Sequence, residues 1–537
     1  HTNPRYPTRP KDIHLENLRS SARSTPRGDL GIRKGASVSE QSRFVSTHML
    51  SVAAGAAGAL ALSLPTFVVL LRAMERSVGL APPIPSQLAG ESAEACALFR
   101  HLPALRLRLA WRSLGAVRTP VHSCGLNGRS FLVKREDLAS PAYGGNKVRT
   151  LQHTLAVLEA RRARAVAEGG AAPGMLVVGS GGSNQVVATA VHAARLGLPP
   201  PDVAWLSPDE PDLDNSLNML SALSFPLGGR VTAWGASASG TLTLAASLLG
   251  LLPKLARGEV VFPIGANTAA GVLGQVGAML ELAEQVAAGE CADPGRVYLP
   301  VGSACTLSGL VLGVALARRL GLPAFRASEF ELVGVPIHHL FAAAERTLRL
   351  HTAAPFSAVP LTVGHTVREG AAALAQLGGP DVTAEALAVL ESEVRFVTRP
   401  DLVGLYGAHS AVSKAAAAEF DAGARVADGA GEAAPTPWMC GHFCAKALAA
   451  LLEELDAAGA PAAPSLLWQT KSLVQPRGER DEWAALAAMP SSVRRWAAEG
   501  EAQSSLRPGC VPAEGAAPDG YRHLMTRVET SPSRTGD

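Results

Sequence analysis

Lysine is scarce in this chain, so chemistry that requires a lysine amine has few candidates. Of the 49 basic residues, only eight are lysines. One of them, Lys147, follows the pair Gly144-Gly145 in the segment FLVKREDLASPAYGGNKVRTLQ (131–152), between a strand-like run and a helical stretch. A lysine at a turn freed by two glycines can reach a cofactor and act through its amine. The alternative is a solvated loop lysine, which is the ordinary role of this residue.

A second segment combines a hydroxyl with two amides. In VVGSGGSNQVVATAVHAARLGL (177–198) a strand-like run ends in small residues, and Ser183, Asn184 and Gln185 follow at a helix start. Ser183 can be an N-cap. A catalytic role is compatible with that one, because the hydroxyl sits at the carboxyl end of a strand, where sites of α/β folds lie.

A third segment, VYLPVGSACTLSGLVLGVAL (297–316), predicts an anion site. A loop of small residues opens an apolar helix, and it consists of Gly302, Ser303, Ala304, Cys305 and Thr306. Backbone N–H groups at a helix N-terminus can cradle a phosphate. The loop lacks the Gly-Lys-Ser/Thr ending of a nucleotide P-loop. A helix cap without any ligand is the alternative.

The elements that must position these residues alternate along the chain. Strand-like runs occupy 175–180, 260–265, 297–303, 330–336 and 465–470, and helical stretches include 186–198 and 306–322. Alternation of this kind predicts an α/β fold with a mostly parallel sheet and helices on both faces.

The order of the three motifs resembles the pyridoxal-phosphate enzymes of the tryptophan synthase β-like fold. More narrowly, it resembles the branch that holds 1-aminocyclopropane-1-carboxylate deaminase and D-cysteine desulfhydrase. The matching segments are KREDLASPAYGGNKVRTL, GGSNQ and GSACTLSGL, and the resemblance covers about residues 105–475. It implies two three-layer open-sheet domains with pyridoxal 5′-phosphate between them, the smaller domain being inserted at about 150–290.

The resemblance also implies roles for individual residues. Lys147 would form the Schiff base with the cofactor and shuttle the Cα proton. Ser183 would act over the other ring face as a base or carboxylate contact, Asn184 would bond the phenolic oxygen, and Gln185 would help hold the substrate carboxylate. The residues Gly302, Ser303, Ala304, Cys305 and Thr306 would hold the phosphate. Tyr406, in GLYGAHS, resembles the stacking tyrosine of the family.

Two later positions favour the desulfhydrase side of the branch. Cys444 falls where the deaminases carry a glutamate and the desulfhydrases Thr or Ser, and Thr470 falls where the deaminases carry a leucine and the desulfhydrases a threonine. A carboxylate at the pyridine nitrogen would deepen the electron sink. Opening a cyclopropane ring needs that help, whereas β-elimination of a thiolate does not. Both Cys444 and Thr470 are therefore expected at the cofactor.

Three departures from the family pattern concern the substrate side. Phe443 replaces a tyrosine, Lys471-Ser472 replaces a glycine pair, and Ala304-Cys305 replaces two glycines of the phosphate loop. Lys471 either points into the site or lies on the surface. The loop keeps its backbone donors but loses conformational freedom.

The ends of the chain differ from its centre. Residues 1–48 are polar and predict a disordered or targeting segment. Residues 49–71 form an uncharged run, so 49–72 is expected to be a transmembrane, signal-anchor or targeting segment rather than a buried stretch. The protein would accordingly be membrane-anchored or directed to an organelle such as a mitochondrion or plastid, or cytoplasmic if 1–80 is not a genuine targeting region. Residues 476–537 are expected to be a largely irregular tail.

The composition of the chain excludes several classes of protein. A net charge of +3 gives no electrostatic case for nucleic acid, and seven cysteines in 537 residues form no disulfide framework. Cys440 and Cys444 flank His442, but no second Cys/His pair lies nearby, so no metal is expected. The predicted function is α,β-elimination on a small amino acid, with D-cysteine preferred, by a homodimer. The alternatives are 1-aminocyclopropane-1-carboxylate deamination and a catalytically retired, membrane-anchored binding protein.

Overall fold

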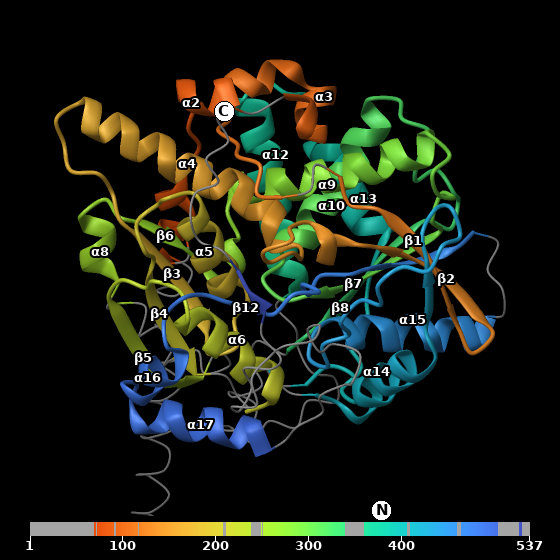
Figure 1. The fold of residues 1–537 in the computed structure, drawn as a ribbon. Coiled ribbons are helices and arrows are strands. Elements are labelled where there is room, and N and C mark those ends of the chain that lie inside the picture. The colour runs from red at the N-terminus through yellow and green to blue at the C-terminus, as the bar shows by residue number, and fades with distance from the viewer. Residues whose placement is uncertain are drawn as a thin grey trace, which may run out of the picture. The chain divides into compact units, whose positions relative to one another are not determined.

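The computed structural model describes residues 69–70, 72–90, 93–115, 118–207, 211–237, 249, 251–338, 359–404, 407, 409–458, 463–502 and 526–528. The two larger sheets that these residues form are mostly parallel and lie on opposite sides of Figure 1, and a third sheet has two strands. The predicted α/β architecture of two open-sheet domains is therefore confirmed.

The larger sheet has seven strands in the spatial order β10-β1-β2-β11-β7-β8-β9. β1 is antiparallel to both of its neighbours, and the strands from β2 to β9 run parallel. β11 enters the middle of the sheet, with Leu466 opposite Leu132 on one side and Val297 on the other. Its insertion brings the residues that follow it next to those that follow β2 and β7. The bounds are β1 Val121–Leu126, β2 Arg129–Lys134, β7 Arg296–Val301, β8 Glu331–Pro336, β9 Val394–Phe396, β10 Arg425–Ala427 and β11 Ser465–Trp468.

The smaller sheet has four parallel strands in the order β5-β4-β3-β6. Their bounds are β3 Met175–Ser180, β4 Asp202–Ser207, β5 Arg230–Ser237 and β6 Val260–Phe262. All six residues of β3 are buried, as expected for a parallel strand that is covered on both faces. Leu176 and Val178 pack with Met74, and Val177 packs with Val187 and Leu220 of the helices on the other face. The alternation along β3 thus produces three layers.

Helices cover both faces of the larger sheet as well. Figure 1 shows α9 and α10 on one side of β7 and β8 and α15 on the other. The main helices are α4 Lys147–Ala167, α5 Asn184–Arg195, α6 Leu213–Leu223, α9 Ala269–Ala287, α10 Cys305–Arg319, α12 Val359–Gln376, α13 Thr383–Ser392, α14 Ala411–Gly423 and α15 Cys444–Ala458. The shorter ones are α2 Pro85–Gly90, α3 Ala97–His101 and α8 Leu252–Ala256, with 3-10 turns η1 Ala93–Ala95, η2 Pro103–Leu107, η3 Glu136–Leu138 and η4 Ile264–Ala266. The strand and helix positions predicted from the sequence are confirmed within a few residues.

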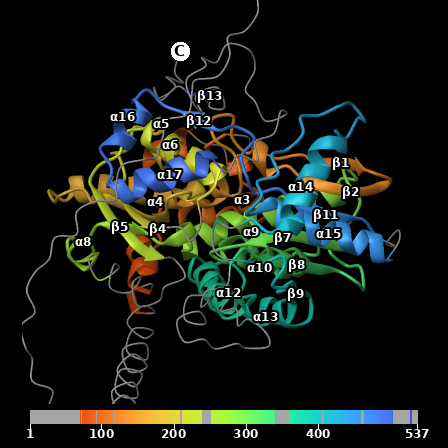
Figure 2. The same ribbon diagram turned by 90° about the horizontal axis from the view of Figure 1, so that it is seen from below.

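The expectation of an irregular tail after residue 475 is wrong for its first part. Residues 476–502 form β12 Pro476–Arg477, α16 Glu482–Ala487 and α17 Ser491–Ala502, and β12 pairs with β13 Thr526–Arg527. Both views place α17 beside α6 (Figures 1 and 2). The buried residues Leu486, Met489, Val493 and Trp496 recur at intervals of three and four, so an amphipathic pattern was present in the sequence.

The catalytic unit also begins earlier than the expected residue 105. Leu70 and Met74 are buried in the core of the smaller sheet, and Leu98 and Phe99 are buried against α9. The expected span 49–72 lies mostly outside the described residues, as do residues 1–48. Among the described helices, none is both long and apolar enough to cross a membrane.

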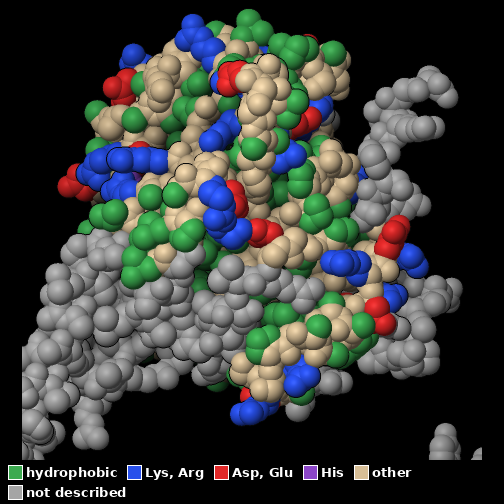
Figure 3. Space-filling view, turned by 90° about the vertical axis from the view of Figure 1, so that its left-hand side faces the viewer, with side chains coloured by type: hydrophobic (Ala, Val, Ile, Leu, Met, Phe, Trp, Pro, Cys, Tyr) green, Lys and Arg blue, Asp and Glu red, His purple; other side chains and the backbone are tan. Residues whose placement is uncertain are grey.

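The described surface carries charges of both signs. On the face drawn in Figure 3, Lys and Arg side chains occur next to Asp and Glu side chains, with apolar side chains between them. This mixture agrees with the small net charge of the chain.

Candidate active site

A cavity of about 200 Å³, here called the lysine cavity, lies where strands of both sheets end and helices begin. Lys147, Ser183 and Thr306 line it from the starts of α4, α5 and α10, and Thr470 lines it from the segment after β11. The carboxyl ends of parallel strands are the usual place for a site in such folds. The three motifs, which are far apart in the chain, therefore meet in one cavity.

The Lys147 amine is buried in this cavity. Nζ donates a hydrogen bond to the Gly265 carbonyl at 3.3 Å. Burial lowers the pKa of Lys147, and the nearby Cys305 opposes this shift only in part. Gly265 has a φ of +70°, and a Cβ there would lie 2.1 Å from Ser303 Oγ and 3.2 Å from the Lys147 Nζ. A glycine is thus required to keep the space beside the amine open.

The turn that carries Lys147 is fixed against β11. Gly145 has a φ of +92°, and a Cβ there would lie 2.5 Å from the Thr470 carbonyl oxygen. Gly145 N–H donates to the Glu136 carbonyl at 2.7 Å, and Asn146 N–H donates to the Thr470 carbonyl at 3.2 Å. The two glycines therefore allow close contact between the lysine turn and the end of β11, rather than mobility of the lysine.

The Asn184 side chain presents its amide group in a defined orientation. Its Oδ1 accepts hydrogen bonds from Tyr143 Oη at 2.7 Å, Asn218 Nδ2 at 3.0 Å and Lys471 Nζ at 3.4 Å. An ammonium group can only donate, so the atom facing Lys471 must be the oxygen. The NH₂ group is left for the cavity, where it suits an oxygen acceptor of a ligand.

Ser183 and Gln185 also line the lysine cavity. Ser183 is the residue before α5, but its side chain makes no capping hydrogen bond, so its hydroxyl is not committed to the helix. Gln185 Nε2 donates to Thr189 Oγ1, which leaves Oε1 as a buried acceptor without a partner. The second N–H of Nε2 is not used by Thr189, so the role of Gln185 at the substrate carboxylate stays a prediction. The first N–H groups of α5, which have no acceptor within the helix, could serve the same carboxylate.

The loop before α10 provides a second helix N-terminus. Gly302, Ser303, Ala304 and Thr306 line the cavity, and Ala304 has a φ of +71°. A left-handed backbone conformation costs an alanine about 1 kcal/mol or more in conformational free energy. Ala304 has this cost because it stands where the family has a glycine. Asn146 Nδ2 holds Thr306 Oγ1 at 2.8 Å. The side chain of Cys305 is buried outside the cavity wall, at 3.8 Å from Thr150 Oγ1. Cys305 could therefore contribute only its backbone N–H.

Cys444 and Thr470 lie together at another part of the wall. The Cys444 Sγ and Thr470 Oγ1 atoms are 3.3 Å apart, and Thr470, not Cys444, lines the cavity. Burial alone would raise the pKa of Cys444, but hydrogen bonds with Cys440 and Thr470 have the larger effect. The net result is a pKa of about 7, below the ordinary value of a thiol. Phe443 lines the same wall. Among the described residues that line the cavity, Glu75 is the only one that carries a carboxylate.

Lys471 is buried, 2% exposed, and does not lie on the surface. Besides Asn184, its Nζ donates to Asn218 Oδ1 at 2.8 Å and to Gln475 Oε1 at 2.9 Å, and it lies 4.9 Å from the centre of the Trp438 ring. Lys471 is thus a positioning residue for Asn184, acting from behind the cavity wall.

Replacing Lys471 with methionine is expected to shift the visible absorption band of the bound cofactor and to lower kcat/KM about tenfold. The reason is that one charge-assisted hydrogen bond, typically about 1.5 kcal/mol or more, no longer fixes the amide of Asn184. Absorption spectra and steady-state kinetics measure the two effects. Lys254→Met, which removes a lysine paired with Asp202 and Glu259, is the control. An unchanged spectrum in Lys471→Met would contradict the positioning role.

The charged residues of the KREDL segment are buried and structural. Arg149 donates to Glu136 and Glu281, and Lys134 Nζ donates to Glu281 at 2.6 Å. Arg135 forms a buried ion pair with Asp137. These residues lie below the lysine turn and connect it to α9. No role for these charges was predicted from the sequence.

One predicted site residue cannot be placed, and three residues of the site were not predicted from the sequence. Tyr406 lies outside the described residues, so its role stays a prediction. Tyr143, Asn218 and Gln475 belong to the network around Asn184 but carried no signal of their own, since only the fold brings α6 and the segment after β11 together.

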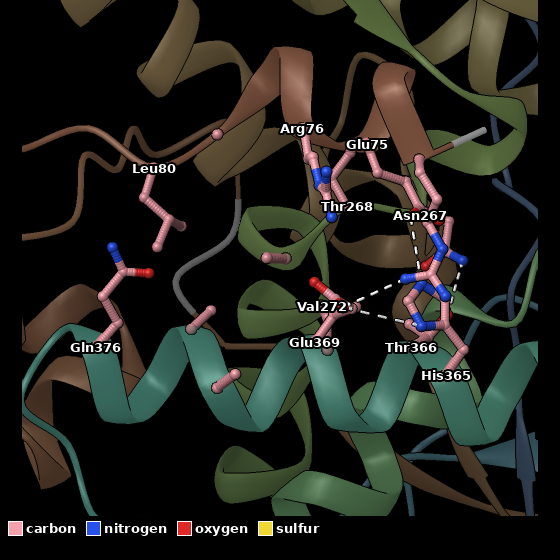
Figure 4. A pocket seen from close by; sticks show the side chains of 15 residues that line it. Glu75, Arg76, Leu80, Asn267, Thr268, Val272, His365, Thr366, Glu369 and Gln376 are labelled. Atoms are coloured by element: carbon pink, nitrogen blue, oxygen red, sulfur yellow. Dashed lines mark hydrogen bonds and ion pairs between the residues drawn. The ribbon is translucent and has the colours of Figure 1, made fainter. Parts of the chain in front are cut away.

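A second cavity, of about 310 Å³, adjoins the first and shares Glu75 and Asn267 with it. Figure 4 shows Glu75 and Arg76 extending from the helical residues 72–78 toward the side chains of α12. Two ion pairs connect these elements: Glu75 with His365 at 3.3 Å, and Arg72 with Glu369 at 3.3 Å. The N-terminal helical segment therefore forms part of the wall of both cavities.

Comparison with known proteins agrees with this geometry. The sequence model of the family described as "Pyridoxal-phosphate dependent enzyme" matches residues 112–463, more than half of the chain. Nocardicin C-9′ epimerase of Nocardia uniformis subsp. tsuyamanensis is 37% identical over 213 residues, covering 39% of this chain and 59% of that protein. D-cysteine desulfhydrase of Serratia proteamaculans (strain 568) is 33% identical over 211 residues, covering 39% and 58%.

A more distant relative and a solved structure complete the comparison. A putative 1-aminocyclopropane-1-carboxylate deaminase of Pyrococcus furiosus is 29% identical over 196 residues, which is 36% of this chain and 54% of that protein. The crystal structure of an ACC deaminase homologue covers 70% of this chain and 94% of its own, with 19% identity and a TM-score of 0.46. The matches to the curated relatives span less than three fifths of each relative's length.

Proposed function

Because the chain belongs to the family of pyridoxal-phosphate-dependent enzymes, we propose that it catalyses α,β-elimination on a small amino acid, D-cysteine being preferred. The products would be pyruvate, sulfide and ammonia. The observation that carries this proposal is the hydroxyl of Thr470 in the cavity wall, 3.3 Å from the thiol of Cys444, which stands where a deaminase of this family would carry a glutamate. The predicted homodimer, membrane anchoring and cellular location stay predictions.

The residues of the lysine cavity fit pyridoxal 5′-phosphate. The N-terminus of α10 would hold the phosphate, Lys147 would hold the aldehyde carbon, and the Asn184 amide would donate to the phenolic oxygen. Two buried polar atoms, Ser180 Oγ and Gln185 Oε1, have no partner within the described protein. Buried polar atoms are normally paired, so these two support a polar ligand in the cavity.

When bound, the cofactor supplies electron withdrawal that stabilises negative charge at the substrate Cα. The Lys147 amine is the group that removes the Cα proton. Its lowered pKa makes the neutral amine more available near neutral pH, which a base requires. Ser183 and the first N–H groups of α5 would orient the substrate carboxylate.

The choice of reaction follows from the leaving group. Thiolate leaves readily from Cβ, so the reaction does not need a carboxylate that keeps the pyridine nitrogen protonated, and a hydroxyl partner suffices. The hydroxyl of Thr470, backed by the Cys444 thiol, offers such a partner. Deamination of 1-aminocyclopropane-1-carboxylate is the second candidate, because a relative named as a putative deaminase matches this chain. The absent glutamate at position 444 argues against it.

A substrate screen with purified protein decides between these reactions. D- and L-cysteine and 1-aminocyclopropane-1-carboxylate are supplied separately, and sulfide, pyruvate and 2-oxobutanoate are measured. Sulfide and pyruvate from D-cysteine in equal amounts support the proposal. 2-Oxobutanoate as the main product would favour the deaminase, and inversion of a stereocentre without pyruvate would favour an epimerase. Absence of turnover for every amino acid tried would favour a retired enzyme.

A further inference from the structure

Two histidines and two aspartates from distant parts of the chain meet outside the lysine cavity. The cluster consists of Asp212, Asp214, His409 and His442, and one potential ligand atom of each lies within 4.8 Å of the others. Asp212 is the N-cap of α6 and Asp214 belongs to its first turn, while His409 and His442 lie just before α14 and α15. Three of the four residues are buried, and His409 is nearly so, with 8% of its side chain exposed.

The ring nitrogens that face Asp212 make no hydrogen bond to its carboxylate. His409 Nε2 lies 3.4 Å from Asp212 Oδ1, and His442 Nδ1 lies 3.6 Å from Asp212 Oδ2. His409 Nε2 and both ring nitrogens of His442 have no hydrogen-bond partner in the described structure. His442 is only 2% exposed, so water does not readily satisfy these atoms. Unpaired nitrogens in so buried a position need an explanation.

A shared metal ion explains the spacing. Two ligand atoms bonded at about 2.1 Å to one tetrahedral ion are about 3.4 Å apart. The imidazole nitrogens lie at about this distance from the nearest oxygens of Asp212, His409 from Oδ1 and His442 from Oδ2, and one of these two oxygens would bind the ion. A direct hydrogen bond would bring such atoms to about 2.7–2.9 Å.

The carboxylate of Asp212 is already oriented by other donors. Asp214 N–H donates to Oδ1 at 2.7 Å, and Asn215 Nδ2 donates to Oδ2 at 2.7 Å. Such outer contacts fix a ligating carboxylate and leave further lone pairs available. The ring of His409 packs closely against the backbone of Gly441, where a Cβ would lie 2.1 Å from Nδ1.

The ligand types suit a cation. Imidazole nitrogens and carboxylate oxygens are common ligands of divalent transition metals. The nearby ammonium group of Lys471 is bound to three side-chain oxygens, those of Asn184, Asn218 and Gln475.

We propose that Asp212, Asp214, His409 and His442 bind one divalent transition-metal ion, and that this ion is zinc. Imidazole and carboxylate ligands in a four-ligand set match tetrahedral zinc, whereas Ca²⁺ and Mg²⁺ prefer oxygen ligands alone. The protein fills all four positions, so the site is structural. It joins α6 to the segments before α14 and α15. His442 also contacts Phe443 with a ring-centre distance of 4.2 Å, so the ion would hold the wall of the lysine cavity in place.

The metal content of tag-free, purified full-length protein tests this proposal, by elemental analysis after dialysis against zinc and then against metal-free buffer. About one zinc ion per chain is expected. His442→Gln and Asp212→Asn should each retain less than a tenth of it; asparagine still caps α6, so the second variant guards against loss of the helix. His101→Ala, which removes an imidazole paired with Glu284 elsewhere, should keep the full content.

Two further readouts separate ligation from folding. Cobalt should give the wild type an intense visible absorption that Asp212→Asn lacks, and zinc should raise the melting temperature of the wild type but not of Asp212→Asn. Circular dichroism verifies that the variants are folded. The proposal is overturned if the wild type retains no zinc, or if Asp212→Asn and His442→Gln retain as much as His101→Ala. Both outcomes are independent of any amino-acid turnover and of the cofactor.

Discussion

Replacing Lys147 with alanine is expected to abolish the visible absorption band of the lysine-bound cofactor and to lower sulfide release from D-cysteine by about a thousandfold or more. The variant loses both the amine that holds the cofactor and the base that removes the Cα proton. No other lysine lines the cavity among the described residues, and the Lys471 ammonium is bound to Asn184, Asn218 and Gln475. Absorption spectra and sulfide assays at saturating cofactor measure the two effects.

Chemical rescue distinguishes the amine from the space it fills. A small primary amine added to Lys147→Ala should restore part of the activity, because it can enter the space of the missing side chain and accept the proton. Lys254→Met, a lysine loss at the edge of the smaller sheet, should leave both the spectrum and the rate at the wild-type level. If Lys147→Ala kept the absorption band and full sulfide release, the proposed mechanism would be wrong.

Replacing Glu281 with glutamine is expected to lower the free energy of unfolding by about 3–5 kcal/mol, the usual cost of breaking a buried ion pair by removing one partner. Glu281 is 1% exposed and accepts hydrogen bonds from Lys134, Arg149 and Thr119. A glutamine amide would turn an NH₂ group toward two cations or leave them without compensation. Urea unfolding monitored by circular dichroism measures the loss. The comparison variant is Glu284→Gln on the same helix. Glu284 is 19% exposed in its pair with Arg100, so solvent can reach the cation left behind and the loss should be smaller than for Glu281→Gln.

The same substitution should change the acid side of the stability profile. Burial raises the pKa of Glu281, but Arg149 and Lys134 lower it by more, to about 2 from an ordinary value of 4.5. Because the folded-state pKa is depressed, this carboxylate stabilises the wild type above about pH 4.5, and the contribution is lost as the pH falls toward 2. The Glu281→Gln variant should therefore lose less stability than the wild type over that interval. Equal pH profiles for the two proteins would contradict the role of this network.

The sequence predicted the parts of the site that depend on local order. Lys147, Ser183 and Thr306 each follow a strand and glycines or small residues at a helix start, and parallel strands place such positions at one edge. The cavity wall therefore contains all three. The role of Lys471 could not be predicted in this way. It lies directly after the central strand β11, and its partner Asn218 is on α6, so their contact exists only after the two sheets have packed.

The histidine cluster illustrates the same limit. In the sequence, His442 lies between Cys440 and Cys444, and a metal site was considered only for these three residues. The structure instead turns His442 toward Asp212, more than two hundred residues earlier, while Cys444 contacts Thr470. The C-terminal helices α16 and α17 are a different case. The spacing of their apolar residues could be seen in the sequence, but the polar composition of residues 476–537 led to the prediction of an irregular tail.

The N-terminal helical residues 72–78 place a limit on where an active form of this protein can begin. Glu75 contributes to both cavities and Met74 to the core of the smaller sheet. A chain shortened to begin at residue 80 would lack both residues, and the cavity would be open from one side. The span 49–72, expected to be a transmembrane or targeting segment, thus overlaps the folded core at Leu70.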